Sequence, residues 1–143
     1  MNSRRFSLVS AIVQSEFAEK LTSASGERSY RAISVIAQIS FQIEKLFRIG
    51  RINFDPPPRV ESTAISLIPK FQASHFVLDH ARIRTIDFIF SFRGRRLSSA
   101  LKKLAPDQPL GLIPEQLKAT RVENLTPGNY QEIILELEGV QVS

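Results

Sequence analysis

A proline-rich segment with a single aromatic residue is the part of this sequence best suited to bind a flat ligand. Residues 53–60 read Asn-Phe-Asp-Pro-Pro-Pro-Arg-Val. The consecutive prolines fix φ at each position and remove the amide donors, which predicts a stiff extended loop that cannot pair inside a sheet. Phe54 lies at the mouth of this loop, where its ring either stacks on a ligand or packs into the core. Asn53 and Pro56 would shape the loop rather than react.

A dense group of positive side chains forms a second candidate site. Residues 82–103 contain seven lysines and arginines and one acid, Asp87. This charge suits contacts with RNA phosphates, although a run of charge is more commonly a solvated helix face. Because the group straddles a predicted helix break at Gly94, it would project from a turn, which favours RNA contact. Its members are Arg82, Arg84, Arg93, Arg95, Arg96, Lys102 and Lys103.

Composition excludes several other chemistries. The chain of 143 residues has no cysteine, which excludes disulfides, thiolate metal sites and a cysteine nucleophile. His75 and His80 have no third ligand at a familiar spacing, so we expect no metal site. The net charge of +5 fits a polyanion partner. No apolar run approaches the roughly 18 residues that span a bilayer, so we expect a cytoplasmic protein with no membrane partner.

Hydrophobic patterning predicts two parts that meet near residue 70. Strand-like runs cover residues 6–13, 42–49 and 60–68, and helical patterns cover 15–21, 30–39, 75–92, 97–104, 114–119 and 126–138. We expect Ser15 and Thr126 to cap helices and Gly94 to end one. The prediction is therefore an α/β part over residues 1–70 and an all-helical part over residues 71–143.

Four short motifs occur in the order in which one enzyme family has them. The proline segment continues as Val-Glu-Ser-Thr and then a strand pattern. Upstream, residues 13–21 read Val-Gln-Ser-Glu-Phe-Ala-Glu-Lys-Leu and residues 26–35 read Gly-Glu-Arg-Ser-Tyr-Arg-Ala-Ile-Ser-Val. Downstream, residues 90–102 read Phe-Ser-Phe-Arg-Gly-Arg-Arg-Leu-Ser-Ser-Ala-Leu-Lys. Together these motifs resemble the ribosomal RNA adenine dimethyltransferases, a family that includes small-subunit rRNA enzymes and erythromycin-resistance methyltransferases.

The resemblance implies both a fold and an activity. The fold would be the last strands of a Rossmann-like methyltransferase sheet, followed by a small helical C-terminal domain. The family transfers methyl groups from S-adenosylmethionine to adenine in small-subunit rRNA. Phe54 would then stack on the flipped-out target adenine, and the basic group would hold the rRNA or ribosomal subunit. The sequence departs from the family at Gly94, where an arginine is usual, and at Arg96, where a threonine is usual.

The family's cofactor and acceptor motifs do not occur in this sequence. It has neither a Gly-x-Gly-x-x-Gly loop nor an Asn-x-Pro-Tyr tetrapeptide. We therefore expect a C-terminal portion of the enzyme that has no catalytic residue of its own, binds no S-adenosylmethionine alone and is inactive alone. One alternative is a non-catalytic RNA-binding or ribosome-associated module. A less favoured one is a DNA-binding protein that uses its helices as a helix-turn-helix.

An open sheet edge would be the structural consequence of such a portion. If only the last strands of the sheet are present, the strand at residues 6–13 has no inner neighbour. An exposed apolar edge invites pairing with another chain. We therefore expect either self-association or pairing with a missing N-terminal half through this strand.

Overall fold

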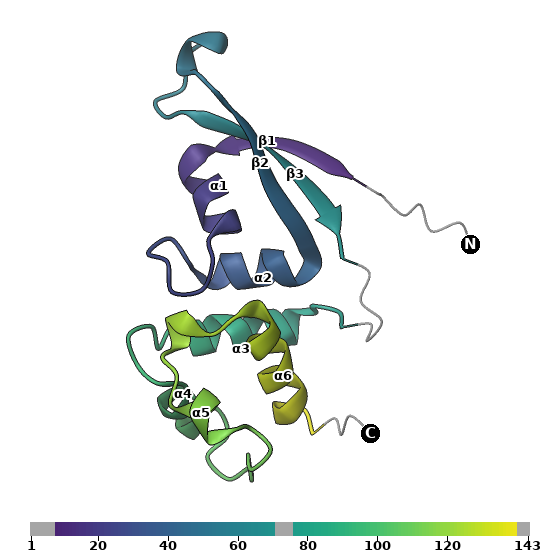
Figure 1. The fold of residues 1–143 in the computed structure, drawn as a ribbon, viewed down its shortest axis with the longest axis vertical. Coiled ribbons are helices and arrows are strands. Elements are labelled where there is room, and N and C mark those ends of the chain that lie inside the picture. The colour runs from purple at the N-terminus through teal and green to yellow at the C-terminus, as the bar shows by residue number, and fades with distance from the viewer. Residues whose placement is uncertain (1–7, 71–75, 140–143) are drawn as a thin grey trace, which may run out of the picture.

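The chain folds into a small sheet with two helices against it, followed by a group of further helices (Figure 1). A computed structural model describes residues 8–70 and 76–139. The first part contains β1 (Val9–Gln14), α1 (Ser15–Thr22), α2 (Ala32–Ser40), β2 (Phe41–Ile49), the 3-10 helix η1 (Arg51–Asn53) and β3 (Ser62–Pro69). The second contains α3 (His80–Phe90), α4 (Leu97–Leu104), α5 (Glu115–Lys118), the 3-10 helix η2 (Val122–Asn124) and α6 (Pro127–Leu137). The predicted α/β class with a helical remainder is confirmed at this level.

The sheet has three strands in the order β1-β3-β2, and both strand pairs are antiparallel. Alternation along β3 places Ile65 and Leu67 on the face that packs against α1 and α2. Ile65 forms a small core there with Ala18 and Leu21 of α1. The strand predicted at residues 60–68 is therefore confirmed, with observed bounds Ser62–Pro69. The covered face also fixes the register, because a slip of one residue would move Ile65 to the other face.

Within the described part of the chain, β1 is an edge strand that pairs with β3 alone. Residues 6–7 of the predicted strand lie outside the described residues. The face of the sheet away from α1 and α2 carries Ile12 of β1 and Phe47 of β2, which both lie opposite Ala64 of β3. Ile12 is 59% exposed and Phe47 is 62% exposed. Among the described residues β2 is an edge strand as well, so the sheet has two open edges and an open apolar face.

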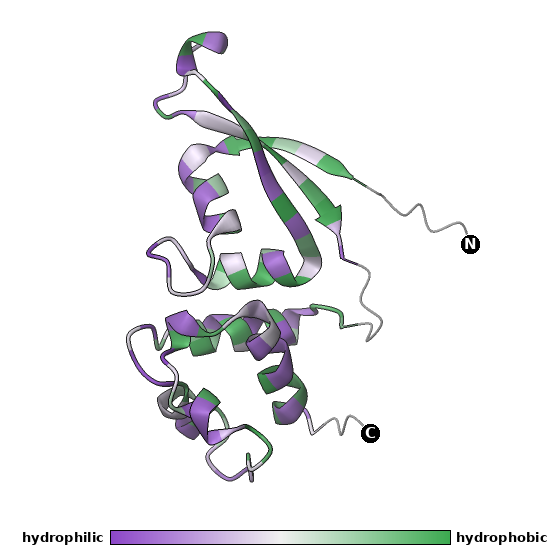
Figure 2. Ribbon diagram, in the orientation of Figure 1, coloured by the Kyte–Doolittle hydropathy of each residue, from purple (hydrophilic) through white to green (hydrophobic). Residues whose placement is uncertain are grey.

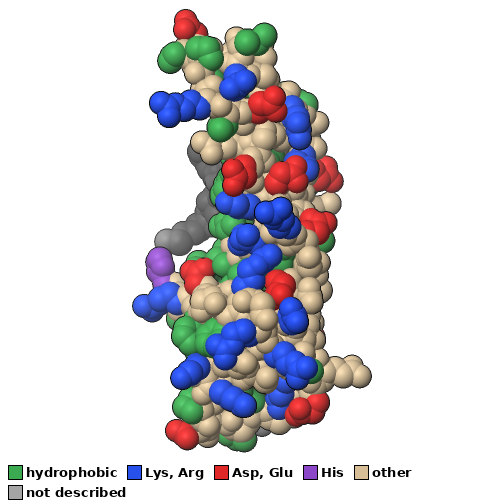
Figure 3. All heavy atoms as spheres, turned by 90° about the vertical axis from the view of Figure 1, so that its left-hand side faces the viewer, with side chains coloured by type: hydrophobic (Ala, Val, Ile, Leu, Met, Phe, Trp, Pro, Cys, Tyr) green, Lys and Arg blue, Asp and Glu red, His purple; other side chains and the backbone are tan. Residues whose placement is uncertain are grey.

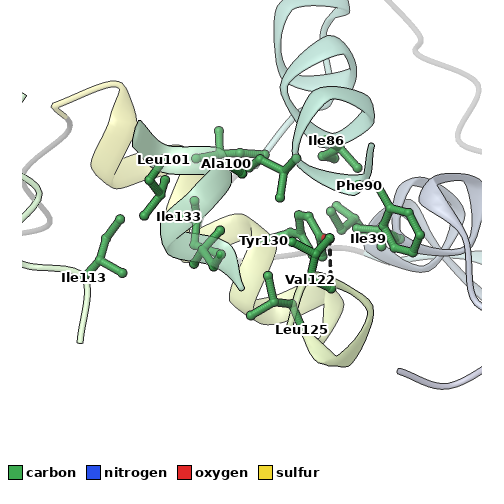
Figure 4. Close-up of a cluster of buried hydrophobic side chains, with 14 of the residues drawn as sticks. Ile39, Ile86, Phe90, Ala100, Leu101, Ile113, Val122, Leu125, Tyr130 and Ile133 are labelled. Carbon is green, nitrogen blue, oxygen red and sulfur yellow. Dashed lines mark hydrogen bonds between the residues drawn. The ribbon is translucent and has the colours of Figure 1, made fainter. Parts of the chain in front are cut away.

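A larger hydrophobic core joins the helical part to α2. Its buried side chains come from α2, α3, α4, α6 and the loop before α2, and Figure 4 shows Ile39 of α2 and Phe90 of α3 among them. Tyr130 of α6 stacks with Phe90, with their ring centroids 6.4 Å apart. Hydrophobic residues recur along both α2 and α3 (Figure 2). The core thus crosses residue 70, and the division into two domains at that residue stays a prediction.

Two buried tyrosines attach the segment around η2 to this core. The hydroxyl of Tyr30 donates to the Leu125 carbonyl at 2.7 Å, and that of Tyr130 donates to the Val122 carbonyl at 3.2 Å. Burial raises the pKa of both phenols, so each remains a protonated donor. A buried hydroxyl needs such a partner, and these bonds fix the position of the η2 segment.

Two helix starts differ from the sequence prediction. Gln14, not Ser15, occupies the N-cap position of α1, because the Ser15 hydroxyl forms a hydrogen bond of 2.7 Å with Thr63 of β3. α3 begins at His80 rather than at residue 75. Asp79 caps it by accepting the backbone N–H of Arg82 at 2.9 Å. Of the predicted helix, residue 75 lies outside the described residues.

The predicted Thr126 cap is confirmed, whereas Gly94 does not end its helix: α3 stops at Phe90, with Ser91 at the C-cap. Thr126 caps α6 by accepting the backbone N–H of Asn129 at 3.1 Å, with Pro127 in the first turn. Gly94 has a φ of +86° in the turn that follows α3, a conformation that favours glycine.

In residues 8–70 and 76–139, no group of three or more His, Asp or Glu side chains could hold a metal ion. His75 lies outside this part of the chain. The helices described are all too short or too polar to cross a membrane.

Candidate RNA-binding site

The proline segment forms a tip at the end of the sheet that points away from the helical part (Figure 1). The backbone N–H and the side-chain amide of Asn53 both donate to the Gly50 carbonyl, at 3.1 and 3.3 Å. Phe54 follows this turn; its ring is partly exposed and belongs to neither hydrophobic core. Pro56 is exposed and follows a cis peptide bond. The assignment of these residues to base binding stays a prediction.

The predicted basic group lies at three places in the structure. Arg82 and Arg84 lie on α3, and two lysines lie in the last turn of α4. The remaining three arginines lie in or beside the turn between α3 and α4, at residues 91–96. Figure 3 shows Lys and Arg side chains gathered over the lower half of the face that includes this turn. The exposed members are Arg84, Arg93, Arg95, Arg96, Lys102 and Lys103.

Arg82 is engaged within the protein. Its Nε donates to Glu138 at 2.8 Å, and its guanidinium lies 4.4 Å from the centre of the Phe76 ring. The hydrogen bond to Glu138 raises the pKa of Arg82 despite some desolvation. Arg82 thus ties the start of α3 to the end of α6, and its assignment to RNA contact stays a prediction.

Arg93 connects the helical part to the sheet part. Its guanidinium donates to the Tyr30 carbonyl at 2.6 Å and to the Arg28 carbonyl at 3.3 Å. It also lies 5.9 Å from the centre of the Phe90 ring. These contacts hold the α3–α4 turn against the loop between α1 and α2, residues 23–31. The same guanidinium keeps donors that no carbonyl uses, since arginine has five N–H groups.

Glu123 is a structural link at the candidate site that the sequence analysis missed. Its carboxylate accepts the backbone N–H of Gly94 at 2.8 Å, and its carbonyl accepts the N–H of Gly26 at 2.8 Å. Partial burial acts to raise the pKa of Glu123, but the Gly94 and backbone hydrogen bonds and the charges of Arg93 and Arg121 outweigh it and lower the pKa. One residue thus joins a glycine turn from each part of the chain. No sequence pattern could reveal this, because the three segments meet only through tertiary packing.

The structure does not bring the two predicted sites together. The tip that carries Phe54 and the α3–α4 turn lie on opposite sides of α2 in Figure 1. A small ligand could not touch both. A partner that contacts both must be extended, as a nucleic acid is.

Comparison with known proteins identifies the family. The sequence model described as ribosomal RNA adenine dimethylase matches residues 1–138. The chain belongs to the ribosomal RNA adenine dimethylase family. The match covers the Phe54 tip, the α3–α4 turn and Glu123, so all the candidate residues lie in the dimethylase region. The family resemblance given by the sequence motifs is confirmed.

Relatives of the dimethylase family extend the comparison. The probable ribosomal RNA small subunit methyltransferase A of Thermococcus onnurineus is 34% identical over 134 residues, which cover 85% of this chain and 47% of that protein. The crystal structure of a dimethyladenosine transferase from Plasmodium falciparum has a similar fold, with a TM-score of 0.78 and 20% identity over 96% of this chain and 59% of that one. A 23S rRNA methyltransferase, ErmE, matches with a TM-score of 0.59 and 17% identity over 96% and 57% of the two chains.

The chain spans half or less of the length of three curated relatives, which are ribosomal RNA small subunit methyltransferases. It covers 42%, 33% and 50% of them. The activity of those whole proteins can therefore be assigned to this chain only as a proposal.

Proposed function

We propose that this chain forms the target-binding end of an rRNA adenine dimethyltransferase. The observation that carries the proposal is the family match over residues 1–138, which contains both the tip and the basic turn. In this role Phe54 stacks on an adenine of small-subunit rRNA that has left its helix, while Asn53 and Pro56 hold the loop in shape. The basic side chains contact the rRNA phosphates, which position the RNA without reading its sequence. The location that suits this target is the cytoplasm.

The proposal also says which part of a methyltransferase the three-stranded sheet corresponds to. We propose that β1, β3 and β2 correspond to the last strands of a Rossmann-like methyltransferase sheet and that the helices after residue 70 form the C-terminal domain. The coverage of about half of the curated relatives supports this assignment. The family match favours it over the non-catalytic module as the alternative.

S-adenosylmethionine supplies the methyl group in this reaction when it is bound. Two of the cavities among the described residues have volumes of about 230 Å³, between α3, α4 and α6, and about 170 Å³, beside β2. No glycine lines either cavity, and Arg82 and Glu138 at the larger one already bind each other. These residues do not fit the cofactor, so we propose that the chain alone has no cofactor site and no methyltransferase activity.

The open edge of the sheet suggests where further protein would bind. We propose that β1 pairs with a strand of another polypeptide, either a second copy of this chain or the part of a dimethylase that this chain does not cover. The exposure of Ile12 beside this edge supports the proposal, since burial of an isoleucine is favourable by about 1.5–3 kcal/mol.

The test is to incubate the purified chain with undermethylated small ribosomal subunits and S-adenosylmethionine that carries a labelled methyl group. We expect the chain to co-sediment with the subunits, less so as salt rises, and to transfer no label. Transfer of label would contradict the absence of a cofactor site. Failure to bind the subunits at low salt would contradict the proposed function itself.

A further inference from the structure

We propose that arginines from three separate segments form one phosphate-binding surface where the sheet part meets the helical part. This inference rests on the proposed RNA-binding function and names the surface that performs it. The segments are residues 23–31, residues 91–96 and residues 121–124, and we call their arginines the junction surface. Its members are Arg28, Arg31, Arg93, Arg95, Arg96 and Arg121.

Backbone contacts place the three segments side by side. Arg93 donates to the carbonyls of Arg28 and Tyr30, which joins the first segment to the second. Arg96 and Arg121 form an antiparallel bridge, and the N–H of Val122 donates to the Arg95 carbonyl at 2.9 Å, which joins the second to the third. The Glu123 carbonyl accepts the N–H of Gly26 at 2.8 Å, which closes the set. The arginines therefore lie together although they are far apart in the sequence.

The charge of these segments is strongly positive, and only Arg93 and Arg121 are partly balanced, by the Glu123 carboxylate. They hold six arginines and two glutamates, Glu27 and Glu123. Each glutamate already accepts a backbone N–H, from Ala24 at 3.2 Å and from Gly94 at 2.8 Å. In the described part of the chain, the side chains of Arg28 and Arg96 form no hydrogen bond or ion pair, and both are exposed. Like charges held so close repel one another, and a polyanion would relieve that repulsion.

The side-chain geometry suits an RNA backbone in particular. The guanidinium of Arg95 lies 5.1 Å from the centre of the Phe92 ring. Together the planar guanidinium and the ring offer flat surfaces on which an RNA base can stack. Arginine forks bind phosphate oxygens in pairs, which lysine cannot do. The junction surface consists only of arginines, and it lies between the Phe54 tip and α4 on the molecule (Figure 1). An RNA strand bound there can run toward the tip.

The neighbouring surface of α1 offers a matched control. Lys20 lies 3.6 Å from Glu16, and Lys45 of β2 lies 2.6 Å from Glu19. The positive charge of each lysine is therefore paired with an adjacent carboxylate. Their removal changes the net charge by the same amount as removal of two junction arginines. Exposed pairs of this kind contribute about 0–1 kcal/mol to stability, so the control should stay folded.

The experiment measures binding of the full chain to a fluorescein-labelled RNA hairpin by fluorescence anisotropy over a series of salt concentrations. We expect Arg28→Gln/Arg121→Gln to weaken binding roughly tenfold and to reduce the salt slope by about 1–2. We expect Lys20→Gln/Lys45→Gln to change the affinity less than about twofold. Arg28→Lys/Arg121→Lys should recover most of the salt slope, because it restores the charge. Thermal unfolding should show that the three variants fold like the unsubstituted chain.

The outcomes separate this inference from the proposed function. If the Arg28/Arg121 variant binds as the Lys20/Lys45 variant does, while the unsubstituted chain binds well, the junction surface is overturned and RNA binding stands. If the unsubstituted chain does not bind the hairpin at low salt, both the junction surface and the proposed function are overturned.

Discussion

At the scale of single residues, Glu123 should make the stability of the folded chain depend on pH. Its pKa is lowered from the ordinary value of 4.5, so the folded chain binds this proton less readily than the unfolded chain. The stabilisation is therefore present above pH 4.5 and is lost as the pH falls through the lower, folded-state pKa. Glu123→Gln should remove this part of the pH dependence and lower the free energy of unfolding at neutral pH by about 1 kcal/mol, because the amide can still accept the Gly94 N–H but lacks the charge that strengthens this hydrogen bond.

Urea unfolding of both chains at neutral pH and well below pH 4.5 measures the difference. Glu16→Gln is the matched control, because that carboxylate is 84% exposed on α1. An equal pH dependence in the Glu123 and Glu16 variants would contradict the role given to Glu123.

Phe54 has an effect on bound RNA that differs from that of the arginines. If its ring stacks on one base, Phe54→Ala should leave the affinity for small ribosomal subunits within about twofold, because phosphate contacts set most of that affinity. It should abolish the fluorescence change of a single 2-aminopurine placed in a single-stranded RNA, since that change reports stacking. Phe54→Tyr keeps the ring and should retain the change. Loss of the signal in Phe54→Tyr, or its survival in Phe54→Ala, would show that the ring is not the platform.

At the scale of elements, the sequence correctly predicts those helices, strands and caps that are determined by residues close together in the chain. The strand at residues 60–68 and the Thr126 cap of α6 follow from local patterns, and the structure confirms both. Ser15 fails as a cap because its hydroxyl finds a partner on β3, which sequence patterns cannot anticipate. α3 starts five residues later than predicted, at His80, where the Asp79 carboxylate caps it by accepting the backbone N–H of Arg82.

The same holds for the candidate site: its local motifs can be predicted from the sequence, and its contacts between distant segments cannot. Phe54 and the basic turn are recognisable from motifs, since each is contiguous in the sequence. Arg28 and Arg121 join the junction surface only because Arg93 and Glu123 bring their segments to the α3–α4 turn. Such a surface depends on packing between parts of the chain, so a sequence alone does not reveal it.

At the scale of the whole molecule, the open edge of the sheet determines how chains meet. β1 pairs with β3 alone among the described residues, and Ile12 on its open face is 59% exposed. We expect the purified chain to self-associate as its concentration rises in sedimentation velocity, because an apolar edge strand pairs readily. Ile12→Lys should weaken that association roughly tenfold, since it replaces an isoleucine whose burial is worth about 1.5 kcal/mol or more with a charge.

The choice of control makes this last prediction specific to the edge. Leu112 is 74% exposed in the loop before α5, far from the sheet, so Leu112→Lys adds the same charge at a site that the edge does not include. Association through β1 requires that Leu112→Lys behave like the unsubstituted chain. Equal effects of the two substitutions would point to association by net charge or another surface. A chain that stays monomeric at every concentration would show that the helices and strand ends already protect β1, and that its partner is not a second copy.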